Sequence, residues 1–106
     1  MEKGLIFTED KKDIEPRIIE TIESWECALS TKNTPSILVL TRQNLPLVRK
    51  HYIKKNMVFK GGYIVKNASN YDVTILSSGS EVSIAIETSE KLKKENINAR
   101  VVSIVC

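Results

Sequence analysis

Hydrophobic residues recur at three- and four-residue steps between positions 18 and 30. This period predicts a helix with one apolar stripe packed against a core, and Glu20 and Glu23 near its start are expected to favour the helix dipole. Cys27 is expected to be buried as a small hydrophobe. The stripe consists of Ile18, Ile19, Ile22, Trp25 and Leu29.

An almost wholly apolar run follows the predicted helix. Residues 31–35, which include Pro35, break the helix, and residues 36–41 read Ser-Ile-Leu-Val-Leu-Thr. A short run of this kind, rich in β-branched residues, predicts a strand buried on both faces, as in a parallel sheet. Residues 4–8 form a second short apolar segment and predict another strand.

The middle of the chain is more polar. Residues 42–60 form a connection, for which the pattern predicts one helical turn around residues 48–57. Gly61-Gly62 marks a change of direction, and we expect a domain boundary near it. Residues 63–65 predict a short strand, and residues 67–71 predict a turn-rich loop.

The last third of the chain has the clearest pattern. Residues 72–77 and 99–104 predict two strands, with a tight turn at 78–80 and a helix capped by Ser80 or its neighbour between them. Strand, helix and strand at this spacing predict a right-handed βαβ crossover. The fold class is therefore α/β, with a small parallel or mixed sheet. The apolar face of this helix is expected to hold Val82, Ile84, Ala85, Ile86, Ser89 and Leu92.

The composition narrows the choice of function. The chain has 106 residues, 42% hydrophobic and 27% charged, which suits one small globular domain or the edges of two. A net charge of +3 is too small and too dispersed for a nucleic-acid-binding protein. We expect no signal peptide, and no apolar run approaches the roughly 20 residues that span a bilayer. A cytoplasmic protein with no membrane or nucleic-acid partner is expected.

Most residues of the types that bind metals or catalyse reactions in other proteins lack, in this sequence, the neighbouring residues that such sites need. Cys27 and Cys106 form no C-x-x-C pair, so no metal site is predicted. His51 and the basic stretch at 49–55 are expected to be solvated, with phosphate binding as the less favoured interpretation. Residues 77–81 favour a helix cap over an anion site. No paired acid–base carboxylates and no nucleophile motif are recognisable.

Arg42 is the strongest single candidate for a binding residue. It follows a predicted buried strand directly. Ligands of open α/β sheets bind beyond the carboxyl ends of the strands, where an arginine fork is well placed to hold a phosphate or a carboxylate. By position alone, pairing of Arg42 with a neighbouring acid or carbonyl is equally favoured.

Five segments, in order and at consistent spacing, resemble the transketolase family. Each is weak alone, but together they are specific, and they run from about Glu20 to Ser103. The second resembles the family's S-R-Q-N-L-P and the fourth its A-T-G-S-E-V. The segments are 20–25 (Glu-Thr-Ile-Glu-Ser-Trp), 41–46 (Thr-Arg-Gln-Asn-Leu-Pro), 60–65 (Lys-Gly-Gly-Tyr-Ile-Val), 77–82 (Ser-Ser-Gly-Ser-Glu-Val) and 99–103 (Ala-Arg-Val-Val-Ser).

The resemblance implies a function for the intact family. Transketolases transfer a two-carbon ketol unit between sugar phosphates, using thiamin diphosphate and a divalent metal at a site between two subunits. Arg42 matches the arginine that helps to bind the sugar's phosphate in that family. The family's substrate-contacting aspartate falls at Arg17 here. The diphosphate- and metal-binding G-D-G region and the glutamate that activates the cofactor have no counterpart in this sequence.

We therefore expect no catalytic, cofactor-binding or metal-binding residue and no cofactor for this chain alone. Arg42 is the one candidate contact to a sugar phosphate. The predicted parts are a divergent lead segment (1–19), the end of a pyrimidine-binding-like domain (20–58) and the start of a transketolase C-terminal-like domain (59–106), expected to stop after one crossover.

Two alternatives stay open for the function. The first is an inactive transketolase fragment, either the product of a truncated gene or one part of a split enzyme. The second is a non-enzymatic interaction module, because truncation of an α/β sheet leaves apolar faces and open strand edges. Its partner is either a second copy, giving a homo-oligomer, or a complementary transketolase fragment.

Overall fold

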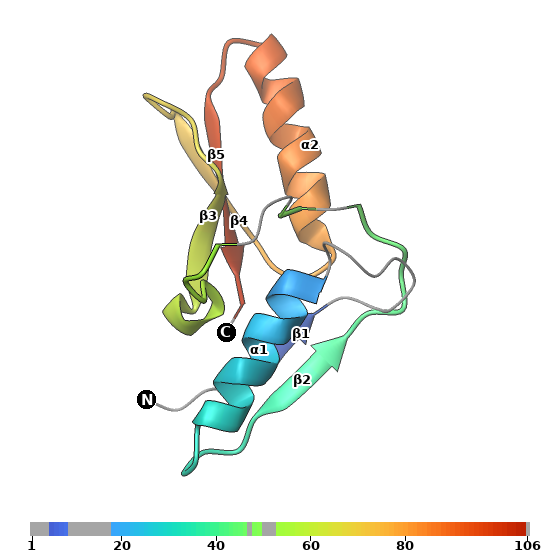
Figure 1. Ribbon diagram of the computed structural model, residues 1–106. Helices are drawn as coiled ribbons and strands as arrows, with labels where there is room; N and C mark the ends of the chain where they lie inside the picture. The colour runs from blue at the N-terminus through green and yellow to red at the C-terminus, as the bar shows by residue number, and fades with distance from the viewer. Residues whose placement is uncertain (1–4, 9–17, 47, 50–52, 106) are drawn as a thin grey trace.

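Two small sheets and two helices make up the fold of this chain (Figure 1). The computed structural model describes residues 5–8, 18–46, 48–49 and 53–105. Within them, strands β1 and β2 form one sheet, and strands β3, β4 and β5 form the other. The expected α/β class with a small mixed sheet is confirmed. Arg17, His51 and Cys106 lie outside the described residues.

The first sheet joins the two short apolar segments that the sequence marks as strands. β1 (Leu5–Thr8) runs parallel to β2 (Ile37–Leu40), with Leu5 opposite Ile37 and Thr8 opposite Leu40. The expectation that this second strand is buried on both faces is wrong, because Ile37 is 64% exposed and Leu40 is 46% exposed. Within the described residues the sheet has only these two strands, and exposed apolar side chains lie on both faces of β2.

Helix α1 spans Ile18–Ser30, with the bounds that the hydrophobic period predicts. Its apolar stripe, however, does not face the core, since Ile22 is 57% exposed, Trp25 is 51% exposed and Leu29 is 75% exposed. The buried side of the helix carries Glu23, Ser24 and Cys27. The prediction is confirmed for Cys27 and wrong for Trp25. Glu20 and Glu23 point toward the protein interior because they accept hydrogen bonds there from donors described below.

The connection between the two halves of the chain contains a short 3-10 helix, η1 (Val58–Lys60). The helical turn expected around residues 48–57 is not found at positions 48–49 or 53–57, the described part of that range. Gly61 follows η1 with a φ of 76°, a left-handed conformation, and its N–H donates to the Val58 carbonyl at 2.9 Å. A glycine adopts this φ without a clash of a Cβ atom, so the chain turns sharply here, as predicted.

The second sheet contains the predicted crossover. Its strands are β3 (Gly62–Lys66), β4 (Val73–Ser77) and β5 (Ala99–Ile104), in the order β3-β5-β4. β4 and β5 are parallel and are joined by helix α2 (Glu81–Lys94), which packs on both of them. β3 runs antiparallel to β5. The parallel βαβ unit is confirmed, and β3 makes the sheet mixed.

Helix α2 follows the prediction in most of its positions. Val82, Ala85 and Ser89 are buried against the sheet, whereas Ile84 is 60% exposed and its expected burial is wrong. Ser80 does not cap the helix with its side chain, because its own backbone is already helical (φ −63°, ψ −25°). Its hydroxyl donates to the Glu81 carboxylate at 3.3 Å instead.

The two halves of the chain share one small core. Its buried members are Cys27 from α1, Val58 from η1, Tyr63 from β3 and Val105 just after β5. The Val105 N–H donates to the Gly61 carbonyl at 2.8 Å, and this bond joins the end of β5 to the turn after η1. The core therefore lies at the seam between α1 and the second sheet.

Candidate functional site

Arg42 lies in solvent, just beyond the carboxyl end of β2. The segment that carries it is ordered locally, since the Gln43 N–H donates to the Thr41 hydroxyl at 3.2 Å. Leu45, three residues further on, is buried and anchors the segment to the body of the molecule. Arg42 is thus an exposed guanidinium held on an anchored loop at the end of a parallel strand, as its position in the sequence suggests.

A cluster of buried and half-buried polar side chains at the seam has no counterpart among the candidates from the sequence. Glu20, on α1, accepts hydrogen bonds from the Tyr63 hydroxyl on β3 at 2.9 Å and from the Ser103 hydroxyl on β5 at 3.5 Å. Burial raises the pKa of the Glu20 carboxyl, and the neighbouring carboxylate of Glu23 adds to the rise. Burial and Glu20 together raise the pKa of Tyr63. We call Glu20, Glu23, Arg49, Tyr63 and Ser103 the seam cluster.

Glu23 is the most fully bonded member of the seam cluster. Both of its oxygens accept from the Arg49 guanidinium, at 2.8 and 2.9 Å. The same carboxylate accepts from two consecutive backbone N–H groups, those of Met57 at 2.9 Å and Val58 at 3.3 Å. Asn56 donates to the Glu23 carbonyl and to the Glu26 carboxylate. One helical carboxylate thus orders the whole approach to η1.

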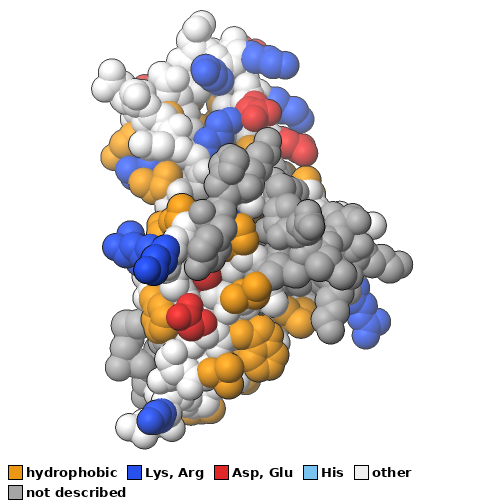
Figure 2. Space-filling model, viewed as in Figure 1, with side chains coloured by type: hydrophobic (Ala, Val, Ile, Leu, Met, Phe, Trp, Pro, Cys, Tyr) orange, Lys and Arg blue, Asp and Glu red, His pale blue; other side chains and the backbone are white. Residues whose placement is uncertain are grey.

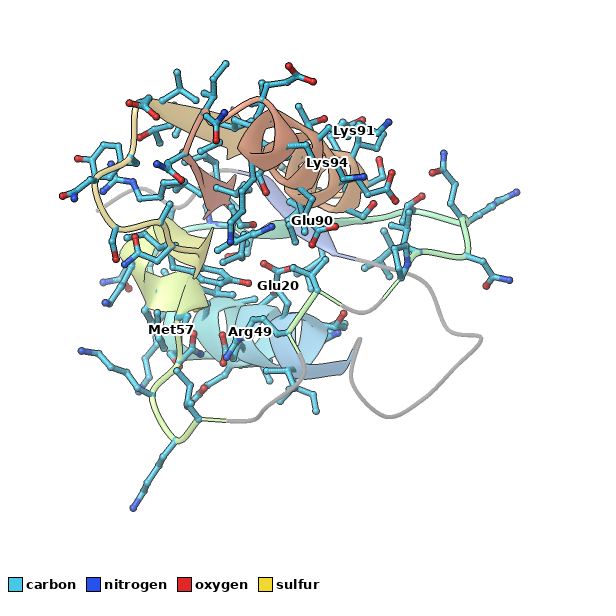
Figure 3. All side chains as sticks on the ribbon, turned by 90° about the horizontal axis from the view of Figure 1, so that it is seen from above. Glu20, Arg49, Met57, Glu90, Lys91 and Lys94 are labelled. Carbon is cyan, nitrogen blue, oxygen red and sulfur yellow. The ribbon has the colours of Figure 1, made fainter. Side chains whose placement is uncertain are left out.

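Arg49 departs from the expectation for its segment. The basic stretch at 49–55 was predicted to be solvated, which is right for Lys54 and Lys55 and wrong for Arg49. The Arg49 side chain is only 11% exposed, and its guanidinium lies 5.2 Å from the centre of the Tyr63 ring. Figure 3 shows Glu20 and Arg49 beside each other at α1, with Met57 at the neighbouring turn.

The geometry of the seam cluster favours a structural role over acid–base catalysis. Glu20 and Glu23 lie three residues apart on one side of a helix, a spacing visible in the sequence, but their partners come from residues 26 to 83 positions away. Both oxygens of Glu23 and one oxygen of Glu20 accept hydrogen bonds from protein donors, which hold these side chains in place within the fold. What the cluster does is join α1 to η1 and to the second sheet.

The described residues contain no candidate site for a metal ion. No group of three or more His, Cys, Asp or Glu side chains in that part of the chain is placed to hold a metal ion. The carboxylates of Glu20 and Glu23 are already bonded to Tyr63, Ser103 and Arg49. Neither helix in the described part of the chain is long and apolar enough to cross a membrane.

Comparison with known proteins gives a consistent result. The family model of the transketolase-like TK C-terminal domain matches residues 61–106. A transketolase of Sinorhizobium medicae is 50% identical to this chain over 91 residues, and one of Rhodobacter capsulatus is 47% identical over 90 residues. In both cases the match covers 84% of this chain and 13% of the relative. The chain thus spans about an eighth of the length of the curated relatives it matches.

Solved structures show the same likeness in three dimensions. Transketolase from Leishmania mexicana superposes on 96% of this chain with a TM-score of 0.79 and 34% identity, over 14% of its own length. A Pichia stipitis transketolase in complex with sedoheptulose 7-phosphate superposes with a TM-score of 0.74 and 32% identity. A split-gene transketolase, described as an inactive tetramer of four beta subunits, shares the fold at 24% identity and a TM-score of 0.71.

Proposed function

Since this chain belongs to the transketolase family, we propose that it is one segment of a transketolase and does not catalyse ketol transfer by itself. The observation that carries the proposal is the match to the Sinorhizobium medicae enzyme. This match covers 84% of this chain but only 13% of the length of that enzyme. Residues 20–58 form the end of the pyrimidine-binding domain in this proposal. Residues 59–106 form the start of the C-terminal domain.

In this proposal the cofactor belongs to the assembled enzyme. Thiamin diphosphate, where the intact family binds it, supplies the carbanion chemistry of ketol transfer, and the protein has to bind and orient it. We assign no step of that chemistry to the described residues, among which no group of three or more His, Cys, Asp or Glu side chains is placed to hold a metal ion. Their contribution is to hold one wall of the substrate site in place.

Arg42 is the residue that we assign to that wall. It is exposed at the carboxyl end of a parallel strand, where ligands of α/β sheets bind. Its planar fork of donors matches the oxygens of a phosphate. The Pichia stipitis relative forms complexes with sugar phosphates, including sedoheptulose 7-phosphate and xylulose 5-phosphate. We assign Arg42 to the phosphate group of such a substrate.

Titration of the purified chain with ribose 5-phosphate, followed by calorimetry or by amide shifts in NMR spectra, tests this assignment. Arg42→Ala is expected to weaken binding by roughly tenfold or more, because a charge-assisted hydrogen bond contributes about 1.5–3 kcal/mol. Arg42→Lys keeps the charge and loses the planar fork of donors, so its affinity for ribose 5-phosphate should lie between those of the parent chain and Arg42→Ala. Lys55→Ala, which removes another exposed cation, is the matched control. Equal affinity for the parent chain and Arg42→Ala would remove Arg42 from the account.

A second candidate function, a non-enzymatic interaction module, is favoured by one observation. Large apolar side chains on α1 and β2 are exposed, among them Trp25, Leu29 and Ile37. A module of this kind associates with itself through these faces. Size-exclusion chromatography with light scattering distinguishes the cases, because a chain that is monomeric at every concentration is not a homo-oligomeric module.

A further inference from the structure

A polar pocket lies where β3 ends, beside the end of α2 and the start of β5. Its volume of about 330 Å³ falls within the range of about 300–1,000 Å³ that is usual for ligand sites. Two of its lining residues, Ser89 and Ala99, are buried, so the pocket reaches down to the packed layer between α2 and β5. We call it the β3–α2 pocket, and its polar lining includes Lys66, Asn67, Lys93 and Asn98.

A β-bulge in β3 brings Lys66 to this pocket. Ile64 lies opposite Val102 of β5, but Lys66 lies opposite Val101, so one extra residue interrupts the ladder. In a regular strand, residues 64 and 66 would point to the same face of the sheet. Here Ile64 is exposed, whereas the Lys66 ammonium reaches α2 and lies 3.3 Å from the Glu90 carboxylate. Bulges occur at sheet edges and beside functional sites, where they redirect a side chain in this way.

The pocket is positively charged within a surface of mixed charge. Lys66 and Lys93 both line it, and none of its described lining residues is acidic. Lys93 forms no ion pair with another described residue. Figure 2 shows basic and acidic side chains mixed at the end of the molecule where α2 ends in Figure 1. The pocket therefore differs from the surface around it in having cations without neighbouring lining carboxylates.

Neutral hydrogen-bond donors supplement the two ammonium groups. The carboxamides of Asn67 and Asn98 line the pocket, and neither is hydrogen-bonded to another described residue. The backbone of Asn98 is held in place, because its N–H donates to the Asp72 carboxylate and its carbonyl accepts from the Asp72 N–H, both at 2.8 Å. The loop before β5 thus presents an available amide from a fixed backbone.

The end of α2 does not exclude an anion from this pocket. A helix C-terminus carries partial negative charge, which by itself disfavours anions. The carbonyls of Leu92 and Lys93, however, accept hydrogen bonds from the N–H groups of residues 95–97. Lys91, Lys93 and Lys94 also lie in the last turn of the helix, where their charges offset the dipole.

We propose that the β3–α2 pocket binds a small molecule through a phosphate group. Its two ammonium groups match the roughly two negative charges of a phosphate monoester, which lysine binds as a point charge. The carboxamides of Asn67 and Asn98 donate to the remaining phosphate oxygens. Glu90 competes with the phosphate for Lys66. The site belongs to the second sheet, and the proposal rests neither on Arg42 nor on the proposed function.

Titration of the purified chain with glycerol 3-phosphate, followed by amide shifts in NMR spectra, tests this proposal. Saturable shifts are expected at residues 67–69 and 98–99, and they should weaken as salt is added. Neutral glycerol should cause none. Lys66→Gln and Lys93→Gln each remove one charge and should weaken binding by roughly threefold to fivefold, the upper range for an exposed charge pair. Lys91→Gln is the matched control, because Lys91 is exposed on the same helix and does not line the pocket (Figure 3).

Glu90→Gln should change the affinity in the opposite direction. It removes the carboxylate that competes for Lys66, so it should tighten binding of glycerol 3-phosphate by about twofold or more. If Lys66 only pairs with Glu90 and Lys93 only balances the helix dipole, neither ligand binding nor this gain is expected. Thermal melts of each variant check that the fold is kept.

Two results would overturn the proposal. One is the absence of saturable shifts at residues 67–69 and 98–99 in the parent chain. The other is an equal loss of affinity in Lys91→Gln and Lys93→Gln, which would show general attraction to the charged end of α2. Arg42→Ala should leave the shift of the Asn98 amide unchanged. Binding at Arg42 is read separately at the Gln43 amide, so failure of one assignment is distinguishable from failure of the other.

Discussion

At the scale of single residues, the seam cluster shows how two carboxylates can be buried in a small protein. Glu23 receives four hydrogen bonds, two of them from a guanidinium, and this number of donors offsets the cost of removing its charge from water. In the described part of the chain, the donors to the Glu20 carboxylate are the neutral hydroxyls of Tyr63 and Ser103. The two carboxylates should therefore respond in opposite ways to loss of charge.

Glu20→Gln is expected to stabilise the chain at neutral pH. Burial raises the folded-state pKa of Glu20 above its usual value of 4.5, so the folded state binds the proton more tightly than the unfolded state. The stability that Glu20 contributes is therefore full below pH 4.5 and is lost as the pH rises through the raised pKa. Glutamine keeps the acceptor for Tyr63 and has no charge to bury.

Urea unfolding of the parent and Glu20→Gln across the acidic to neutral range checks this. The two free energies of unfolding should agree best at acidic pH and separate as the pH rises, by about 1.4 kcal/mol for each unit by which the pKa is raised. A variant that is less stable than the parent at neutral pH would show that the charged form of Glu20 is the stabilising one.

Glu23→Ala is expected to destabilise the chain strongly. It leaves Arg49 without its carboxylate and removes the acceptor of the Met57 and Val58 N–H groups. Breaking a buried pair by removing one partner costs about 3–5 kcal/mol. Glu90→Ala, which removes an exposed pair with Lys66, should cost less than about 1 kcal/mol and is the control in the same unfolding experiment. Similar losses in the two variants would contradict the buried role of Glu23.

At the scale of elements, local sequence pattern predicted most of the structure. Both helices, the strand at 37–40 and the βαβ crossover follow from hydrophobic period and turn residues, which act over a few positions. The orientation of α1 could not be predicted in this way. It depends on Arg49 and Tyr63, which lie far along the chain and meet the helix only in the fold.

The turn between η1 and β3 is the element most sensitive to one residue. Gly61 has a φ of 76° and donates its N–H to Val58, which is itself part of the core. Gly61→Ala is expected to lower the free energy of unfolding by about 1–2 kcal/mol, because a Cβ atom clashes in the left-handed conformation. Gly61→Asn should cost less, since asparagine tolerates that conformation better. Thermal melts of the two variants make the comparison, and equal Tm values would argue against the turn geometry.

At the scale of the whole molecule, this chain spans about an eighth of the length of the curated relatives that it matches. The family and the exposed Arg42 could be predicted from short motifs, because those motifs keep their order and spacing. The expected burial of Trp25 and of the 37–40 strand was wrong for one shared reason. Their patterns are those of a larger α/β domain, of which the described residues contain one edge.

The central claim is that this chain is a transketolase segment that does not catalyse ketol transfer alone. The most direct measurement is the rate of ketol transfer from xylulose 5-phosphate to an aldose phosphate by the purified, folded chain, with thiamin diphosphate and Mg²⁺ supplied. The Sinorhizobium medicae transketolase is the positive control, and a mock purification is the blank. The account predicts a rate equal to that of the blank. A rate above the blank that rises in proportion to the concentration of the chain would contradict it.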